Sequence, residues 1–266
     1  MKEIVRKYIS KAHLFGFDAY KFKRSIKGLS FYKKDLKELI KQKGDDALFP
    51  FGEKKQILDE REESSGNMTG HYFHQDLYVA RRLFNANPRK HLDIGSRTDG
   101  FVAHVASYRE IEVMDIRPQA IDIVNISFRQ ADLMILPEDL VGNYDSISSL
   151  HVIEHFGLGR YGDPIDYNGH LKAFKNVTTL LEDGGIFYFA TPIGRQRIEF
   201  NAHRIFSVEY LLSIFKQDYE VERFSFVNDE GNFFEDAKLD EKSINESYNF
   251  NYGCGIFELR KKNLSK

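Results

Sequence analysis

The chain has 266 residues, of which 42% are hydrophobic and 14% aromatic, and its formal net charge at pH 7 is −2. This composition suits a globular protein with a sizeable core and excludes a chain that is disordered throughout. The near-neutral charge argues against a general nucleic-acid binder. Cys254 is the single cysteine, so no internal disulfide can form, and no apolar run reaches the about 20 residues of a membrane-spanning helix. Because the N-terminus also lacks a signal-type apolar stretch, we expect a cytoplasmic protein.

The first 45 residues form a basic segment with a helical pattern. They hold 13 Lys/Arg against five Asp/Glu, interleaved with apolar and aromatic side chains such as Phe15, Phe17 and Phe22. Such a segment is either a solvated helical extension or a basic amphipathic element that contacts the anionic inner face of a membrane or an acidic partner. Residues 45–70 are polar and broken by proline and glycine, which indicates a loop-rich connector. We therefore expect one unit over residues 1–70 and a second domain over residues 71–266.

From residue 71 onward, strands and helices alternate at short spacing. A helix is expected over 71–87, with Leu77, Ala80, Leu83 and Phe84 on one face. Further helices are expected over 100–108, 167–185 and 207–217, the last with Ser207 as N-cap. Strands are expected over residues 91–95, 111–116, 126–133, 144–152, 185–194, 219–227 and 252–262. This alternation predicts a parallel, doubly wound α/β sheet, whose ligands bind beyond the carboxyl ends of the strands.

The segment HLDIGSRTDGF, residues 91–101, joins the first strand to the next helix through a glycine turn. Gly95 lets the backbone come close to a ligand, and the amino end of the following helix favours negative charge. A dinucleotide fingerprint requires G-x-G-x-x-G, but Arg97 stands at the second glycine position. The sequence therefore argues against a nicotinamide cofactor.

Three carboxylates at the ends of successive strands indicate a different ligand. Asp93 precedes the glycine turn, where it can face an amino group. Asp115 ends the second strand 20 residues after Gly95, where an acid accepts hydrogen bonds from two ribose hydroxyls. Asp132 ends the third strand, where it can accept from an adenine amine, while the N–H of Leu133 can reach a ring nitrogen. An amino acid, a ribose and an adenine together describe S-adenosylmethionine.

These motifs resemble those of the class I S-adenosylmethionine-dependent methyltransferases. HLDIGS, VMDI, ADL, YDSISSLHVIEH and GGIFYFATP follow one another in the order and spacing of that family over about residues 90–261. The resemblance implies a Rossmann-like, mostly parallel sheet with an antiparallel last strand, preceded here by the helical N-terminal extension. It also implies that Ser96, Ile116 and Leu150 contribute to the binding site of S-adenosylmethionine, the methyl donor. More narrowly, GHYFHQDLYVARR and EFNAHRIFS resemble an uncharacterised branch, a domain family of unknown function whose bacterial members often lie beside surface-polysaccharide genes.

The stretch SISSLHVIEHF places His151, Glu154 and His155 at the end of the fourth strand, at a spacing that shares one face of a helical turn. A hydroxyl acceptor needs a general base or a metal that lowers its pKa. One interpretation makes His151 or His155 a base that Glu154 orients. A second makes the cluster a divalent-cation site, because H-x-x-E-H resembles the E-x-x-E-H of small-RNA 3′-terminal ribose methyltransferases and His203 stands where their downstream histidine would. A third interpretation gives the cluster only a structural role in the loop.

Several polar side chains near these motifs are candidates for acceptor binding, although each can also serve only to shape a loop or cap a helix. They are His74, Arg160, Tyr161, Asp163 and Arg204.

The leading hypothesis is an S-adenosylmethionine-dependent O-methyltransferase that acts on a sugar, a glycan or a glycan precursor. The glycan preference comes only from the resemblance. The alternatives are a catalytically inactive cofactor-binding scaffold and a nicotinamide-dependent oxidoreductase or epimerase, although a Tyr-x-x-x-Lys pair beyond the fourth strand is missing for the latter. Methylation of RNA ribose is disfavoured, because the core lacks a basic strip interleaved with aromatic residues.

Overall fold

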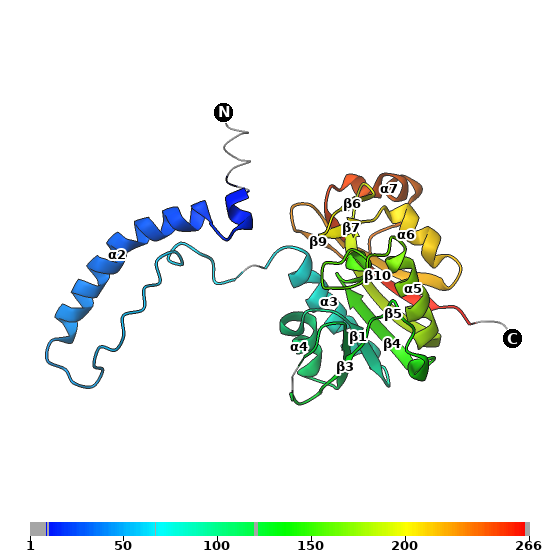
Figure 1. The fold of residues 1–266 in the computed structure, drawn as a ribbon, viewed down its shortest axis with the longest axis horizontal. Helices are drawn as coiled ribbons and strands as arrows, with labels where there is room; N and C mark the ends of the chain where they lie inside the picture. The colour runs from blue at the N-terminus through cyan, green and yellow to red at the C-terminus, as the bar shows by residue number, and fades with distance from the viewer. Residues whose placement is uncertain (1–8, 10, 67, 120–121, 264–266) are drawn as a thin grey trace. The chain divides into compact units, whose positions relative to one another are not determined.

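A computed structural model describes residues 9, 11–66, 68–119 and 122–263 (Figure 1). The chain divides into two compact units, Met1–Asn67 and Met68–Lys266. Within the described ranges, no helix is long and apolar enough to cross a membrane.

The first unit is built on one long helix, α2 (Ala19–Lys43). Asp18 caps it, because its Oδ1 accepts the N–H groups of Tyr20 and Lys21. The connector that follows returns along this helix. It passes so close to Gly28 that a Cβ there would meet the backbone of Leu58, and it places acids against the basic side of the helix, as in the pairs Arg24–Glu63 and Lys21–Asp59.

The second unit contains an eight-stranded sheet in the order β3-β2-β1-β4-β5-β10-β8-β9 (Figure 1). The first five strands are parallel, whereas β10 runs antiparallel to both β5 and β8. The doubly wound, mostly parallel sheet with an antiparallel last strand is therefore confirmed. Its strands are β1 (His91–Ile94), β2 (Ile111–Asp115), β3 (Ile126–Gln130), β4 (Tyr144–Leu150), β5 (Leu181–Ile193), β8 (Tyr219–Val227), β9 (Phe233–Phe234) and β10 (Gly253–Lys261).

Helices cover both faces of this sheet and enclose two hydrophobic clusters. One cluster lies under α3 (His71–Ala86) and α4 (Ala103–Ala106), with Leu83 and Phe101 fully buried. The other lies under α5 (Gly169–Leu180) and α6 (Val208–Phe215), with Phe189 and Phe257 fully buried. The two cores hold the strands rigidly, so the strand ends present their side chains in fixed positions.

The expected elements occur in the expected order, and Ser207 caps α6 as predicted by accepting the N–H of Tyr210. Some boundaries differ. The helix expected to reach residue 185 ends at Leu180, because the next residue, Leu181, already pairs with Tyr144 of β4, and the third and fourth strands end at Gln130 and Leu150, before residues 133 and 152. The unpredicted elements include the hairpin β6 (Arg197–Glu199) and β7 (His203–Ile205), the short β9, and α7 (Glu241–Glu246).

The buried face of α3 also differs from the predicted one. Ala80 and Leu83 are buried, but Leu77 and Phe84 are 51% and 61% exposed. Their places are taken by polar residues that find partners in the sheet; the Tyr78 hydroxyl, for example, donates to Glu258 of β10. Apolar periodicity therefore placed the helix correctly but not its rotation about its own axis.

Candidate functional site

The carboxyl ends of four neighbouring strands meet around one cavity, whose space of about 580 Å³ includes open solvent. This is the edge where parallel α/β sheets bind ligands. The predicted positions Gly95, Asp115, Ile116, Asp132, Leu133, His151, His155, Tyr161 and Asp163 all line it, together with Ile94, Met114, Arg117, Ala131, Met134, Val152 and Phe156.

A glycine is required where β1 turns into this cavity. Gly95 has φ +67°, and a Cβ at this position would lie 2.6 Å from Cγ1 of Val152. Its N–H donates to the carbonyl of Met114, at 2.8 Å, which fixes the turn against the end of β2. The backbone at Gly95 therefore forms part of the cavity wall, as the sequence predicted.

Asp115 lies in the cavity wall, but an arginine two residues later holds its carboxylate. The Nε and Nη2 atoms of Arg117 donate to the two carboxylate oxygens at 3.0 and 2.6 Å, and the guanidinium stacks on the ring of Tyr161. The Arg117 side chain is 48% exposed and that of Asp115 only 9%, so the guanidinium can move into solvent and leave the carboxylate to a ligand hydroxyl. Arg117 was not predicted, although a basic residue so close to Asp115 was a visible signal.

Asp132 and Leu133 line the same cavity on the side of β3. The strand ends at Gln130, so both residues belong to the loop just beyond it. Oδ1 of Asp132 accepts the N–H of Met134 at 2.8 Å, which shapes this loop and leaves the second carboxylate oxygen for another donor.

Three residues that were predicted to bind S-adenosylmethionine lie behind the cavity wall rather than in it. Asp93 is fully buried and accepts hydrogen bonds from the Ser96 N–H, the Ser96 hydroxyl and the Ser148 hydroxyl. Burial raises the pKa of its carboxyl to about 7. The Ser96 hydroxyl in turn accepts the N–H of Leu150, at 3.3 Å. Asp93, Ser96 and Leu150 therefore position the glycine turn, and the contact predicted between Asp93 and a ligand amino group is not formed by this geometry.

The histidine–glutamate cluster is assembled, but not on one face of a helix. His151 has a left-handed φ of +58° directly after β4, and the helical turn comprises only Ile153–His155. Glu154 is fully buried and places Oε1 2.8 Å from His151 Nδ1 and 3.9 Å from His155 Nε2. Burial raises the pKa of Glu154 to about 7 and lowers that of His151 to about 3.

The ring of His155 is held in one orientation. Its Nδ1 lies 2.6 Å from the carbonyl oxygen of Ala202, so Nδ1 carries the proton and donates to that oxygen. Burial lowers the pKa of this imidazole, which keeps it neutral. His155 therefore keeps an unprotonated Nε2, and His155 is among the residues that line the cavity.

The acceptor candidates are divided between the cavity and the surrounding framework. Tyr161 lines the cavity and is 39% exposed, and Arg160 donates to the same Ala202 carbonyl as His155. Asp163 lines the cavity too, but its Oδ2 accepts the N–H groups of Gly157 and Gly159, which shapes the loop.

Arg204, His74 and His203 do not line the cavity. The guanidinium of Arg204 is buried and donates to four backbone carbonyls, those of Glu154, Phe156, Asp166 and Tyr167. These four bonds brace the loop after β4, and a role of Arg204 in acceptor binding stays a prediction. His74 stacks on Phe233. His203 packs beside His155, with ring centroids 6.3 Å apart, and its Nε2 lies 3.3 Å from Glu199.

Two residues near the cluster were not among the predicted site residues. His71, at the start of α3, places Nδ1 3.1 Å from Nε2 of His151, and Cys254 of β10 lies beside both. The only signal in the sequence was the density of histidines in HYFH, because contacts between residues this far apart in the chain follow no local spacing.

One protein family matches more than half of the chain. The family described as "Caenorhabditis protein of unknown function, DUF268" matches residues 104–261, which is more than half of the chain. The chain belongs to the DUF268 family. In this DUF268 chain the matched range includes Asp115, Asp132, His151, Glu154 and His155, whereas β1, the glycine turn and α3 precede it. No match was found among curated proteins.

Solved structures show that the DUF268 chain has the Rossmann-like methyltransferase fold. The [4+2]-cyclase SpnF is 16% identical, with a TM-score of 0.52, and the match covers 71% of this chain and 81% of that one. A Burkholderia thailandensis 1,6-didemethyltoxoflavin-N1-methyltransferase, solved with its substrate and S-adenosylhomocysteine, is 11% identical, with a TM-score of 0.50 and 71% and 79% coverage. Because one of these proteins is a cyclase and the other a methyltransferase, the fold alone does not decide the reaction.

Proposed function

We propose that this DUF268 protein transfers a methyl group from S-adenosylmethionine to a hydroxyl oxygen of a sugar, a glycan or a glycan precursor. The observation that carries the proposal is the cavity at the strand ends. One part of its wall holds the acids suited to a nucleoside, Asp115 and Asp132, and another holds a neutral histidine with a fixed tautomer, His155.

The residues that line the cavity suit the binding of S-adenosylmethionine, the methyl donor. Asp115 would accept the ribose hydroxyls once Arg117 moves aside, and Asp132 keeps one carboxylate oxygen free for an exocyclic amine. The apolar side chains of Met114, Ile116 and Leu133 give an adenine ring a dry surface. Bound S-adenosylmethionine would supply an electrophilic methyl group, and its own sulfur is the leaving group.

His155 is suited to remove the proton of an acceptor hydroxyl. Its Nδ1–H is committed to the Ala202 carbonyl, so Nε2 is the basic atom. Taking up a proton makes the ring an imidazolium, and the Glu154 carboxylate 3.9 Å away stabilises that charge. Glu154 is held in place by His151 and by the Thr191 hydroxyl.

The neighbourhood of His155 supports a hydroxylated acceptor. Tyr161 stands edge-on to the His155 ring, with centroids 5.6 Å apart, and the Arg160 guanidinium lies over the Tyr161 ring. Once Arg117 leaves the Tyr161 ring to make room for the ribose, an aromatic face beside a cation suits the flat apolar face and the polar rim of a sugar. The choice of a glycan over other hydroxyl compounds rests on the resemblance to the polysaccharide-linked branch.

The test compares two histidine variants in a methyl-transfer assay that detects S-adenosylhomocysteine with nucleotide sugars and oligosaccharides as acceptors. His155→Gln should bind S-adenosylmethionine like the wild type but lose turnover by about 10²–10⁴-fold, the usual worth of a general base. The control is His104→Gln, an exposed histidine of α4, which should retain full activity. Full activity in His155→Gln would contradict the role of His155.

Binding measurements with S-adenosylmethionine and a nicotinamide dinucleotide, made beside this assay, distinguish two alternatives. A cofactor-binding scaffold would bind S-adenosylmethionine and release no product with any acceptor. A nicotinamide-dependent oxidoreductase would bind a dinucleotide and not S-adenosylmethionine.

A further inference from the structure

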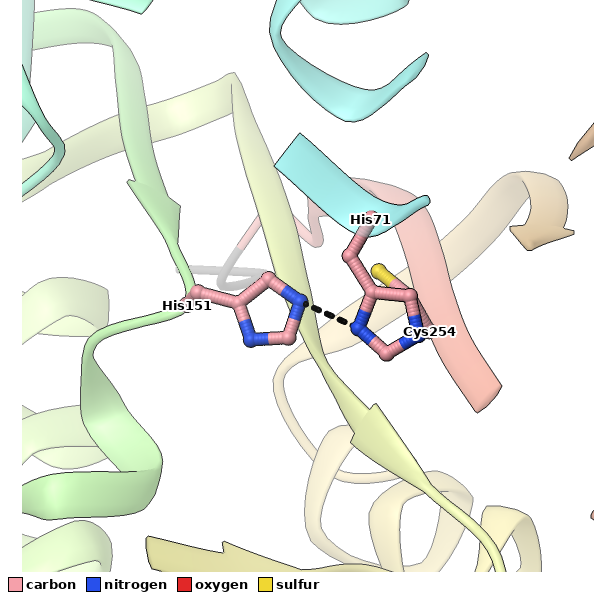
Figure 2. A group of neighbouring side chains, drawn as sticks. All are labelled: His71, His151 and Cys254. Atoms are coloured by element: carbon pink, nitrogen blue, oxygen red, sulfur yellow. Dashed lines mark hydrogen bonds between the residues drawn. The ribbon is translucent and has the colours of Figure 1, made fainter. Parts of the chain in front are cut away.

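Three side chains from distant parts of the DUF268 chain converge beside the cavity. Figure 2 shows His71 from the start of α3, His151 from the end of β4 and Cys254 from β10 pointing toward one another. One ligand atom from each lies within 4.8 Å of the others, and both His151 and Cys254 are buried. We propose that this group, here called the H71–H151–C254 cluster, binds a Zn²⁺ ion.

The spacing of the two imidazoles matches two ligands of one zinc ion. Zn–N bonds of about 2.0–2.1 Å at a tetrahedral angle place two nitrogens about 3.4 Å apart, and His71 Nδ1 and His151 Nε2 are 3.1 Å apart. A sulfur and a nitrogen on the same ion are about 3.6 Å apart. The ligand atoms lie within 4.8 Å of one another, so the Cys254 sulfur has to approach by about 1.2 Å at most.

The contacts of the two rings fit an ion between them when Glu154 is ionised. A continuous chain of contacts runs from Glu154 Oε1 to His151 Nδ1, from His151 Nε2 to His71 Nδ1, and from His71 Nε2 to the carbonyl of Tyr252, at 2.8, 3.1 and 3.2 Å. With Glu154 ionised, two neutral imidazoles supply only two hydrogens for these three contacts, whereas a protonated Glu154 supplies the third. An ion between the rings fits the ionised form, because His151 then donates to Glu154 and His71 donates to the Tyr252 carbonyl.

This arrangement also supplies the outer partners that zinc-binding histidines need. In metal sites a ligating imidazole usually donates its second N–H to a carboxylate or a backbone carbonyl, which fixes its orientation. Here His151 has the carboxylate of Glu154 and His71 has the carbonyl of Tyr252. Both non-ligating nitrogens are therefore satisfied by the groups expected around zinc.

The ligand chemistry selects a borderline-soft metal. Two imidazoles and a thiolate suit Zn²⁺ and do not suit Mg²⁺ or Ca²⁺, which take oxygen ligands. On binding, the sulfur–metal bond forms and the Cys254 thiol proton passes to solvent. With three protein ligands, a water molecule takes the fourth position.

The H71–H151–C254 cluster differs from the cation site predicted from the sequence, which comprised His151, Glu154, His155 and His203. In the structure Nδ1 of His155 is bonded to the Ala202 carbonyl and its Nε2 is 3.9 Å from Glu154, and His203 pairs with Glu199. Of these four, only His151 belongs to the group of potential ligand atoms found among the described residues. The two sites are chemically distinct, because only the H71–H151–C254 cluster contains sulfur.

The proposed site ties the first residue of α3 to the sheet. His71 begins the helix, whereas His151 and Cys254 belong to the strand ends it covers. The inference does not depend on methyl transfer, because the ion links the framework whatever the cavity binds.

The test is a titration of metal-stripped full-length protein with Co²⁺, a spectroscopic substitute for Zn²⁺, in the absence of S-adenosylmethionine. We expect one Co²⁺ per chain and a thiolate-to-cobalt charge-transfer band that added Zn²⁺ abolishes. Cys254→Ser should lose the band, and His71→Gln should weaken Co²⁺ binding at least tenfold. His155→Gln, the matched control from the alternative site, should leave both unchanged.

A second readout keeps the test decisive if a variant folds poorly. Zn²⁺ should raise the thermal midpoint of the stripped wild type, because an ion that binds only the folded state stabilises it. The proposal is overturned if the stripped wild type binds Co²⁺ without a charge-transfer band, or if it binds neither ion. Loss of binding in His155→Gln but not in Cys254→Ser would assign the metal to the alternative site.

Discussion

At the scale of single residues, the assignment of the cavity to S-adenosylmethionine depends most on the side chain of Asp115. Its carboxylate is bound by the Arg117 guanidinium, which occupies both oxygens. A ribose would have to replace this arginine, so the two residues should have opposite effects on cofactor affinity.

We predict that Asp115→Ala weakens S-adenosylmethionine binding by about 1–3 kcal/mol, the range for losing hydrogen bonds to a buried acceptor. Arg117→Ala should leave the affinity unchanged or strengthen it, because it removes the competitor. Isothermal titration calorimetry of both variants measures this. Equal affinity of Asp115→Ala and the wild type would remove the ribose assignment.

Asp93 gives a prediction about pH, because burial raises the pKa of its carboxyl from 3.8 to about 7. Between these values the folded state holds a proton that the unfolded state has released. The free energy of unfolding should therefore fall as the pH rises from about 4 to 7, by at most about 1.4 kcal/mol per pH unit from this group.

Asp93→Asn cannot titrate, so its free energy of unfolding should depend less steeply on pH over this range than that of the wild type. Urea denaturation at several pH values checks the difference. Parallel curves for the two proteins would show that Asp93 is ionised in the folded state.

Residue identity alone could predict part of the site. Local motifs singled out Asp115, Asp132 and His151, and all three line the cavity because each lies at or just after the end of a strand. His71 and Cys254 could not be placed beside His151, since no local pattern relates positions 71, 151 and 254. The burial of Arg204 could not be predicted for a similar reason, because its backbone partners come from other parts of the chain.

At the scale of elements, the turn after β1 shapes the cavity wall. Gly95→Ala combines an unfavourable φ of +67° with a contact of 2.6 Å to Val152. We expect it to lower the free energy of unfolding by about 2–4 kcal/mol, from backbone strain and overpacking together.

Gly142→Ala is the matched control. Its φ is +60° but nothing lies within 4 Å of the added Cβ, so it should cost only about 1 kcal/mol from the backbone. Denaturant unfolding of both variants separates the two contributions. An equal loss in both would mean that Val152 gives way without cost.

Helix α2 combines a high positive charge with exposed apolar side chains. Its 25 residues include nine Lys/Arg against two Asp/Glu, and Tyr20, Phe22 and Ile26 are more than half exposed. We propose that α2 docks on an anionic membrane surface, because the cationic and apolar side chains complement lipid headgroups and acyl chains. Acids of the connector neutralise part of this charge, as in Lys27–Glu62 and Arg24–Glu63.

The protein should co-sediment with vesicles that contain anionic lipid and not with neutral vesicles, and high salt should release it. Phe22→Ser with Ile26→Ser should reduce the binding. Equal sedimentation with neutral and anionic vesicles, or none with either, would contradict the proposal and leave α2 as a solvated extension.

At the scale of the whole molecule, the sequence predicted the order of strands and helices well, because segments of strand and helix pattern alternate and are separated by turn residues. It predicted the rotation of α3 poorly, since Gln75 and Asp76 are buried there while Leu77 and Phe84 are exposed. Polar residues are tolerated on that face because partners in neighbouring elements satisfy them, as in the bond from Tyr78 to Glu258. Such partners are known only once the chain is folded.

We assign the cavity at the strand ends to a methyl donor. The most direct measurement is a calorimetric titration of S-adenosylmethionine into the folded full-length protein, with NADH titrated in parallel. We predict saturable binding of S-adenosylmethionine at one site per chain and no binding of NADH. A folded protein that binds NADH, or that binds no S-adenosylmethionine, would contradict the assignment.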